Sequence, residues 1–294
     1  MKSVVITGVS TGIGWGAAKV LVQKGIRVFG SVRKLEDAER LSAEFGDGFT
    51  PLVFDVRDER AVGAAAKQVR EHLNAETLFG LVNNAGVGLF GPLMHQPVDE
   101  YRLQIEVNLV GPLIVTQAFL PLLGADRSLK GNPGRIINIS SIAGKMAAPF
   151  LGAYAASKHG LEGFSESLRR ELMLYGIDVI IIGPGAVATP IWDKAETTDL
   201  SRYKNTEYAG ALEKFGEYMI PRGRKGYSPE RIGEVIWQAL TSPNPHVRYA
   251  VVPQRLSNWL IPMALPKRVV DQLIAKRFGL RRKQNSSQIQ HHSP

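Results

Sequence analysis

Short apolar runs alternate with longer stretches of helical periodicity along most of the chain. The apolar runs predict strands at residues 3–8, 26–32, 49–56, 77–86, 134–141, 177–185 and 246–252. Between them, apolar side chains at helical spacing predict helices at about 12–24, 35–45, 58–73, 97–123, 152–175 and 229–241. Strands that are apolar throughout, each followed by a helix, are typical of a parallel sheet with helices on both faces. We therefore expect an α/β fold over residues 1–254.

Two further segments do not follow this alternation. Residues 188–226 are polar with scattered aromatic side chains, and we expect them either to surround a substrate or to pack onto the protein body. These aromatic residues are Trp192, Tyr203, Tyr208, Phe215 and Tyr218. Residues 284–294 have the composition of a disordered tail. In that tail, His291 and His292 leave metal binding or a cloning remnant as alternatives.

Positive charge is concentrated near the end of the chain. The 294-residue sequence has a net charge of +9, and the stretch from Leu265 to Gln284 holds seven basic residues and one acidic residue, or +6 of that total. Apolar residues within 267–280 fall near one helical face that basic residues flank. Residues 255–283 are thus predicted to be a basic amphipathic extension. Residues 256–283 fit contact with an anionic membrane, and they also fit packing on the protein body or on a second subunit.

Other features bear on location. The chain has no cysteine, which excludes disulfides and suits a reducing compartment. Its first residues, MKSVVITG, enter a predicted strand at once, so we expect no signal or transit peptide. With no run of about 18 apolar residues, we expect no spanning helix. We expect a cytoplasmic protein, with membrane association through the basic extension as an alternative.

A glycine-rich turn, TGVSTGIG at residues 7–14, follows the first predicted strand. Gly8, Gly12 and Gly14 lack side chains where backbone turns tightly or approaches a ligand. In an α/β fold a dinucleotide pyrophosphate binds here, against the N–H groups of the next helix. The spacing G-x-x-x-G-x-G differs from the commoner G-x-G-x-x-G. A tight turn without a ligand is the alternative.

Tyr154 and Lys158 lie four residues apart in YAASK, which places both on one face of a predicted helix. Such a pair is either a solvated surface pair or an acid–base couple. The pKa of a free phenol is near 10, and an ammonium within about 4–6 Å lowers it. A phenol tuned in this way exchanges protons with an alcohol near neutral pH.

Six motifs occur in series, and together they resemble the short-chain dehydrogenase/reductase family, including its retinol and hydroxysteroid members. They are TGVSTGIG, NNAG at 83–86, Asn108, the serine of NISS, YAASK and PGAVATP at 184–190. The resemblance implies one Rossmann-type doubly wound parallel sheet of about seven strands, with a nicotinamide cofactor. It implies that Tyr154 is the catalytic acid and base, with Lys158 beside it.

The same resemblance implies two further catalytic residues. Ser141 lies thirteen residues before Tyr154 and would hydrogen-bond the substrate oxygen. Ser140 is the competing serine, which we expect to support the turn. Asn108 would hold a water molecule that links Lys158 to solvent, and a hydrogen bond from its side chain to backbone is the alternative.

The cofactor contacts are also implied by resemblance. The turn after the first strand would hold the pyrophosphate, the third strand would end at the adenine, and the fourth at the adenosine ribose. The sixth strand would end at the carboxamide, and Lys158 would bind the nicotinamide ribose. The residues are Gly8, Ser10, Thr11, Gly12, Ile13, Gly14, Asp55, Val56, Asn83, Asn84, Ala85, Gly86, Tyr154, Lys158, Pro184, Gly185, Val187 and Thr189. Ordinary turn chemistry also accounts for Asn and Gly after the fourth strand.

The end of the second strand favours NADP(H) over NAD(H). Val32 stands where an NAD enzyme carries an acidic residue for the ribose 2′-OH, and Arg33 follows it. An arginine fork suits the 2′-phosphate. Many NADP-preferring members carry a second basic residue in the glycine turn, where this chain has Ser10 and Thr11.

We therefore predict an NADP-dependent oxidoreductase that interconverts a carbonyl and an alcohol on a lipophilic substrate. Apolar walls at 87–90 and 145–150 favour such a substrate. The alternatives are a 3-oxoacyl reductase and a non-catalytic cofactor-binding regulator. We expect a homodimer or homotetramer, no metal site and no nucleic-acid partner.

Overall fold

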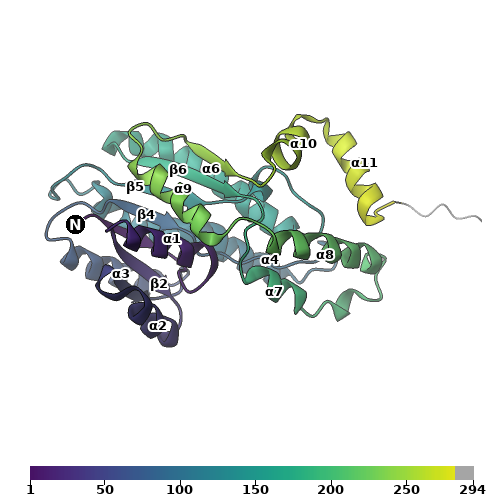
Figure 1. Ribbon diagram of the computed structural model, residues 1–294, viewed down its shortest axis with the longest axis horizontal. Coiled ribbons are helices and arrows are strands. Elements are labelled where there is room, and N and C mark those ends of the chain that lie inside the picture. Colours follow the sequence, from purple (N-terminus) through teal and green to yellow (C-terminus); the bar gives the residue numbers. More distant parts are fainter. Residues whose placement is uncertain (282–294) are drawn as a thin grey trace, which may run out of the picture.

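Seven parallel strands form one sheet in the order β3-β2-β1-β4-β5-β6-β7 in the computed structural model, which describes residues 1–281 (Figure 1). The strands are β1 (Ser3–Ile6), β2 (Arg27–Val32), β3 (Phe49–Val53), β4 (Gly80–Asn83), β5 (Arg135–Ile139), β6 (Asp178–Pro184) and β7 (Arg248–Val251). The predicted fold class is confirmed. From β1 the chain builds outward to β3 and then returns to β4 on the other side, so β1 and β4 flank the point where ligands bind in such sheets.

The strands are apolar throughout because both faces of the sheet are covered. In β1, Val4 and Ile6 face one buried cluster and Val5 faces the other, and all three are 0% exposed. Alternating side chains of a strand point to opposite faces, so a strand between two helical layers needs apolar residues at every position.

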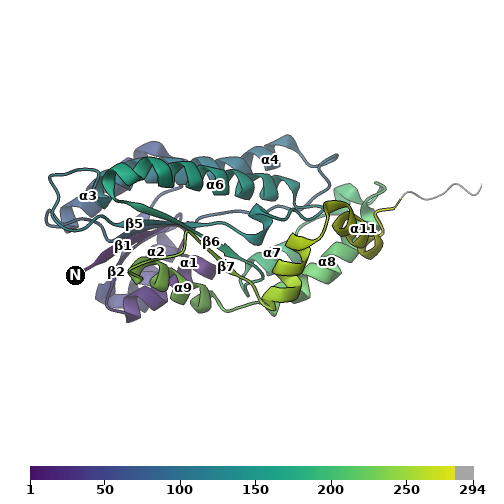
Figure 2. The same cartoon turned by 90° about the horizontal axis from the view of Figure 1, so that it is seen from above.

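Two layers of helices sandwich the sheet (Figure 2). One layer holds α1 (Gly12–Gln23), α2 (Leu35–Phe45) and α9 (Pro229–Thr241). The opposite layer holds α3 (Glu59–His72), α4 (Val98–Ile105), α5 (Gly111–Phe119) and α6 (Gly152–Glu171). Each of these helices was predicted, although the predicted helix at 97–123 has internal irregularities.

The long helix changes its winding at the site. A π-helical turn, Glu106–Val110, separates α4 from α5, and a 3₁₀ turn, Leu120–Leu123, follows α5. Such π turns often mark functional positions. By length and composition alone, the stretch Val98–Leu123 is apolar enough to cross a membrane. Here Val115 and Phe119 lie in the core beneath the sheet, so that apolar character serves packing.

The segment at 188–226 is mostly helical rather than a loop. It contains α7 (Ile191–Glu196), a short turn at Ser201–Tyr203 and α8 (Ala209–Arg224). The extension after β7 contains a π-helical turn (Leu256–Leu260), α10 (Ile261–Ala264) and α11 (Lys267–Phe278), the last matching the predicted amphipathic helix. The predicted disordered tail, 284–294 with His291 and His292, lies outside the described residues.

A third apolar cluster joins these two segments. Phe278 of α11 is 5% exposed and packs edge-on against Phe215 and Tyr218 of α8. Tyr203 and Phe150 belong to the same cluster. The aromatic residues of 188–226 that lie in it, Tyr203, Tyr208, Phe215 and Tyr218, therefore pack the segment onto its surroundings.

Candidate functional site

A cleft of about 390 Å³ opens at the carboxyl ends of β1 and β4. Its walls come from the glycine turn, the ends of β2, β4 and β5, helix α6 and the start of the 188–226 segment. Of the predicted residues, those that line it are Gly8, Ser10, Thr11, Gly12, Ile13, Arg33, Asp55, Val56, Asn84, Ala85, Gly86, Tyr154, Lys158 and Thr189. One cleft thus joins the predicted cofactor turn to the predicted acid–base pair.

The glycine turn is shaped by contacts between backbone segments. Gly8 has a φ of +70°, and a Cβ atom there would lie 2.9 Å from Ala85 Cα. A Cβ atom on Gly14 would collide with the Gly8 carbonyl oxygen and the Asn84 side chain. The Asn84 amide donates hydrogen bonds to the carbonyls of Thr7 (2.8 Å) and Gly8 (2.9 Å). The turn is therefore held in one conformation by the loop after β4.

The start of α1 is suited to a phosphate. Thr11 occupies the N-cap position without a side-chain cap hydrogen bond, and the first turn holds no acidic residue. The N–H groups there are directed at the cleft with the positive end of the helix dipole behind them. The dinucleotide cofactor implied by the fold therefore fits this end of the cleft.

Two of the arginines beside the cleft are held by ion pairs, and a third has no such partner in the part of the chain that the structure describes. Arg57 donates hydrogen bonds to both carboxylate oxygens of Asp55 (3.0 and 2.9 Å), and this holds the pKa of Asp55 below its usual value. Arg40 donates to the Ser10 carbonyl oxygen (2.7 Å) and to Asp37. Within the described residues, exposed Arg33 has no ion pair, so its guanidinium is available to an anionic ligand.

Tyr154 and Lys158 lie one turn apart on α6 at the inner end of the cleft. Lys158 is 4% exposed, its Nζ donates to the Ile139 carbonyl oxygen (2.8 Å), and it lies 5.8 Å from the centre of the Tyr154 ring. Burial lowers the pKa of Lys158 to about 8, and the charge of Glu162 opposes that shift. The pair is therefore not a solvated surface pair.

The pKa of Tyr154 differs from expectation. Burial raises it, and the hydroxyl of Ser141 acts in the opposite direction. The predicted lowering by Lys158 was wrong for this structure, because that ammonium is directed at the Ile139 carbonyl and the phenolate would be poorly solvated. At neutral pH Tyr154 is a neutral phenol that has a proton to donate.

The two serines after β5 have different surroundings. Ser141 caps the turn Ile142–Gly144 by accepting a hydrogen bond from the Ala143 N–H (3.1 Å), and it also interacts with the Tyr154 phenol. Ser140 is 3% exposed, lines the cleft, and its hydroxyl has no hydrogen-bond partner among the described residues. Ser141 therefore supports the turn, which we had expected of Ser140, while its hydroxyl also lies against the Tyr154 phenol.

Three asparagines were predicted at the site, Asn83 and Asn84 after the fourth strand and Asn108 on the long helix, and two of them are turned away from the cleft. Asn108 is fully buried in the π-helical turn, where its side chain accepts from the Val87 N–H and donates to the Val87 carbonyl, both at 2.8 Å. It also donates to Ser157 of α6 (3.0 Å). Asn83 donates to Thr116 and Asn138 inside the core. These two residues support the cleft, whereas Asn84 borders it.

Most of the predicted residues at the end of β6 lie outside the cleft and hold its wall through hydrogen bonds. The Gly185 N–H donates to Val251 (2.9 Å), and the Val187 carbonyl accepts from the Trp192 indole (2.8 Å). Pro184, Gly185 and Val187 are not among the residues that line the cleft, whereas Thr189 is.

Sequence reasoning missed several lining residues. They are Ser31, Phe54, Val107 and Ile139. Each is a sequence neighbour of a residue that was singled out, which is the signal that could have found it. Val87, Gly88 and Leu89 fall in the predicted wall at 87–90, and Ile191, Ala195 and Thr198 fall in the segment at 188–226 that was expected to surround a substrate, although its path was not predicted.

Comparison with known proteins gives a consistent result. A family model described as short chain dehydrogenase matches residues 2–200. The chain is 39% identical to an NADPH-dependent 3-dehydrocapnine reductase of Ornithobacterium rhinotracheale, over 94% of this chain and 97% of that protein. It is 35% identical to retinol dehydrogenase 5 of Homo sapiens, over 92% of this chain and 87% of that protein.

Solved structures share the fold at lower identity. A short chain dehydrogenase/reductase from Burkholderia phymatum in complex with NAD has a TM-score of 0.74 and 21% identity, over 92% of this chain and 95% of that one. A short-chain dehydrogenase from Streptomyces avermitilis has a TM-score of 0.71 and 24% identity, over 94% of each chain. These likenesses concern the arrangement of the sheet and its helices.

Proposed function

The chain belongs to the short-chain dehydrogenase family, and we propose that it uses NADP(H) to interconvert a carbonyl and an alcohol on a lipophilic substrate. As a member it is an oxidoreductase with a nicotinamide cofactor. The observation that carries the finer proposal is the single cleft that joins the glycine turn and Arg33 to Tyr154 and Lys158.

The cofactor supplies or accepts a hydride when it is bound. The N–H groups at the start of α1 bind its pyrophosphate, and Arg33 binds the 2′-phosphate that distinguishes NADP from NAD. Lys158 would bind the nicotinamide ribose, and Thr189, which lines the cleft, would bind the carboxamide. A relative that is named as NADPH-dependent supports this preference.

Tyr154 moves the proton. In carbonyl reduction, the carbon gains a hydride while the phenol of Tyr154 donates its proton to the substrate oxygen, which leaves a phenolate. The Ser141 hydroxyl donates a hydrogen bond to the same oxygen as charge develops. In the reverse direction the phenolate removes the proton of an alcohol. The raised pKa of Tyr154 favours its acid form, which suits reduction.

A lipophilic substrate fits the walls next to Tyr154. Val87, Leu89 and Ile191 line the cleft there. The resemblance to retinol dehydrogenase 5 supports an apolar substrate. A 3-oxoacyl reductase and a cofactor-binding regulator are the competing functions.

The test is a substrate panel measured with NADPH and with NADH. It compares bulky apolar ketones and aldehydes with 3-oxoacyl thioesters, and NADPH fluorescence reports binding separately from turnover. We expect NADPH-dependent reduction of the apolar carbonyls. Faster reduction of the thioesters would identify the acyl reductase, and binding without any turnover would identify the regulator.

We also propose that the protein is cytoplasmic and contacts an anionic membrane through its C-terminal extension. Phe278 and Ile274 of α11 pack on the protein body, but another edge of the extension is open. Its exposed large apolar residues are Leu256, Leu260, Ile261, Met263, Val269 and Leu273. Exposed basic residues, including Lys267 and Arg268, accompany them, and each near-surface basic residue contributes about 1 kcal/mol to binding an anionic leaflet.

Co-sedimentation with vesicles that contain anionic lipid tests this contact. Lys267→Glu combined with Arg268→Glu should reduce binding, as should added salt, while the fold stays intact because both side chains are exposed. Arg60→Glu combined with Lys67→Glu, a matched change of two exposed basic residues on α3, is the control. Equal, negligible binding by all forms would exclude the membrane, and a dimer that dissociates in the first variant would identify a second subunit as the occupant.

A further inference from the structure

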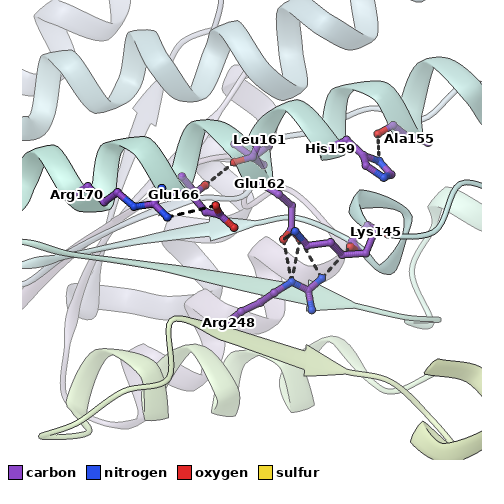
Figure 3. Close-up of polar contacts among 10 residues, drawn as sticks. Lys145, Ala155, His159, Leu161, Glu162, Glu166, Arg170 and Arg248 are labelled. Carbon is purple, nitrogen blue, oxygen red and sulfur yellow. Dashed lines mark hydrogen bonds and ion pairs between the residues drawn. The ribbon is translucent and has the colours of Figure 1, made fainter. Parts of the chain in front are cut away.

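A buried carboxylate lies one helical turn beyond Lys158 on α6. Glu162 is 2% exposed and is paired with Arg248 of β7 (Figure 3). Arg248 Nε donates to Oε1 (3.1 Å) and Oε2 (2.9 Å) of Glu162, and Nη2 donates to Oε1 (2.9 Å). Lys145 adds a third contact, with its Nζ 3.3 Å from Oε2. The carboxylate is thus fully engaged by two cations.

The pair is shielded from water. The side chain of Arg248 is 18% exposed, and the indole of Trp259, itself 8% exposed, lies 5.0 Å from its guanidinium. Taking two charges out of water is costly, and an apolar pair of similar volume often packs at least as well. Packing alone therefore does not explain charges at these two positions.

Each member of the pair acts on one of the proposed catalytic residues, Ser141 or Lys158. Arg248 Nη2 donates to the carbonyl oxygen of Ser141 (3.4 Å). The charge of Glu162 opposes the loss of the Lys158 proton that burial favours. The pair therefore contacts the backbone of one catalytic residue and acts electrostatically on another.

We propose that Glu162, held by Arg248, is a positioning residue that keeps Lys158 charged and holds Ser141 against Tyr154. The inference rests on the proposed function, since it assigns how that site is maintained. The charged or titratable groups around Lys158 are Tyr154 and Glu162 on its own helix, with Arg248 and Lys145 beyond Glu162. Both of those cations contact the carboxylate. Removing the charge of Glu162 therefore makes the surroundings of Lys158 more positive, whereas removing the charge of Arg248 makes them more negative.

This opposition provides the test. In Glu162→Gln the cation of Arg248 is left uncompensated, so the alkaline loss of kcat/KM should move to lower pH, by about 0.5–1 unit. In Arg248→Gln the carboxylate keeps only its contact with Lys145, so its negative charge is less compensated and the same limb should move to higher pH. NADPH affinity, measured by fluorescence over the same pH range, should shift in the same directions without any need for turnover.

Glu166→Gln is the matched control. Glu166 lies one turn further along α6, is exposed, and pairs only loosely with Arg170 at 3.7 Å (Figure 3). Its pH profile should match that of the wild type. Glu162→Asp retains the charge and should also leave the alkaline limb in place, even where it lowers Tm.

The possible results distinguish a failure of this inference from a failure of the proposed function. Shifts of the same sign in both variants, or unshifted profiles with a lowered Tm, would reduce the pair to a structural role and overturn the inference. A wild-type protein that turns over no carbonyl would instead contradict the proposed function. Should Glu162→Gln not fold, Arg248→Gln carries the test alone through its shift to higher pH.

Discussion

The two ends of the cleft differ in the atoms that form their walls, which are backbone atoms at one end and side-chain atoms at the other. At the glycine turn, backbone atoms form the wall, and the side chain of Asn84 holds two successive carbonyls of that wall in place. At the other end, the wall comes from α7, and the segment that carries α7 is held to the body by aromatic side chains such as Phe150 and Phe215. The first end tolerates little variation, whereas the second depends on side chains that can be exchanged.

The proposed function gives the two regions separate tasks. The backbone wall would bind the cofactor, which is the same in every turnover, because N–H groups and helix dipoles do not depend on side-chain identity. The side-chain wall would bind the substrate, which varies. Tyr154 and Lys158 lie between the two walls on α6, and Lys158 is attached to the sheet through its contact with Ile139.

The largest effect is expected where the two regions meet. Tyr154→Phe removes the transferable proton and keeps the ring, so kcat should fall about 10³-fold, the middle of the range for a lost general acid. NADPH affinity should stay within about twofold, since no cofactor contact other than the phenol is changed. Tyr175→Phe, just beyond α6, is the control that should leave kcat unchanged. Comparable losses in both variants would remove Tyr154 from the mechanism.

A glycine-to-alanine change should weaken NADPH binding when it is made in the glycine turn, and it should stabilise the fold when it is made in α8. Gly14→Ala places a methyl group against the Gly8 carbonyl, and we expect NADPH binding to weaken up to about 100-fold, as overpacking of roughly 1–3 kcal/mol allows. Gly216→Ala lies within α8, where the nearest atom would be 4.0 Å away. It should raise the free energy of unfolding by about 0.5–1 kcal/mol. Fluorescence titration and denaturant unfolding of both variants would show whether the backbone wall is as constrained as described.

The sequence was informative about the first region and much less so about the second. Continuous apolar strands and helical spacing predicted every strand of the sheet, although the predicted first strand ran past Ile6, where Gly8 turns the chain out of the sheet. The helices α7 and α8 were not predicted: α7 is only six residues long, and the helical spacing of Ala211, Leu212, Phe215, Tyr218 and Met219 in α8 was overlooked in a segment that otherwise looked polar. The periodicity of apolar residues predicts local secondary structure, but it does not predict which distant parts of the chain a segment packs against.

Side-chain direction was the other limit. Asn83 and Asn84 are neighbours in the same motif, yet one lies in the core and the other clamps the glycine turn. Successive side chains at a strand end point to opposite faces, so a motif identifies the place and not the role of each member. The direction of the Tyr154 pKa shift was missed for a related reason, since burial is not visible in a spacing of four residues.

A smaller effect would show whether the side chain of Arg33, which lines the same end of the cleft as the backbone wall, selects between NADPH and NADH. Arg33→Asp removes a charge-assisted contact to the 2′-phosphate and adds repulsion, so the ratio of kcat/KM for NADPH to that for NADH should fall at least about tenfold. Arg57→Asp is a poor comparison because Arg57 is bound to Asp55, so Arg60→Asp, also exposed, is the control. A wild-type protein that already prefers NADH would show that Arg33 does not select the cofactor.

The smallest effect concerns the side-chain wall. Phe278→Ala removes a ring from the cluster that attaches α11 to α8, and because this cluster is peripheral the neighbours can close in, so we expect a loss of only about 1 kcal/mol. Phe119→Ala makes the same change in the core beneath the sheet, where Phe119 is 0% exposed, and should cost about 3–5 kcal/mol. In Phe278→Ala the KM for an apolar carbonyl should rise severalfold while NADPH affinity stays constant, since the extension supports α8 and not the glycine turn. If NADPH affinity fell together with substrate affinity, the two regions would be one cooperative unit and the division of tasks between them would not hold.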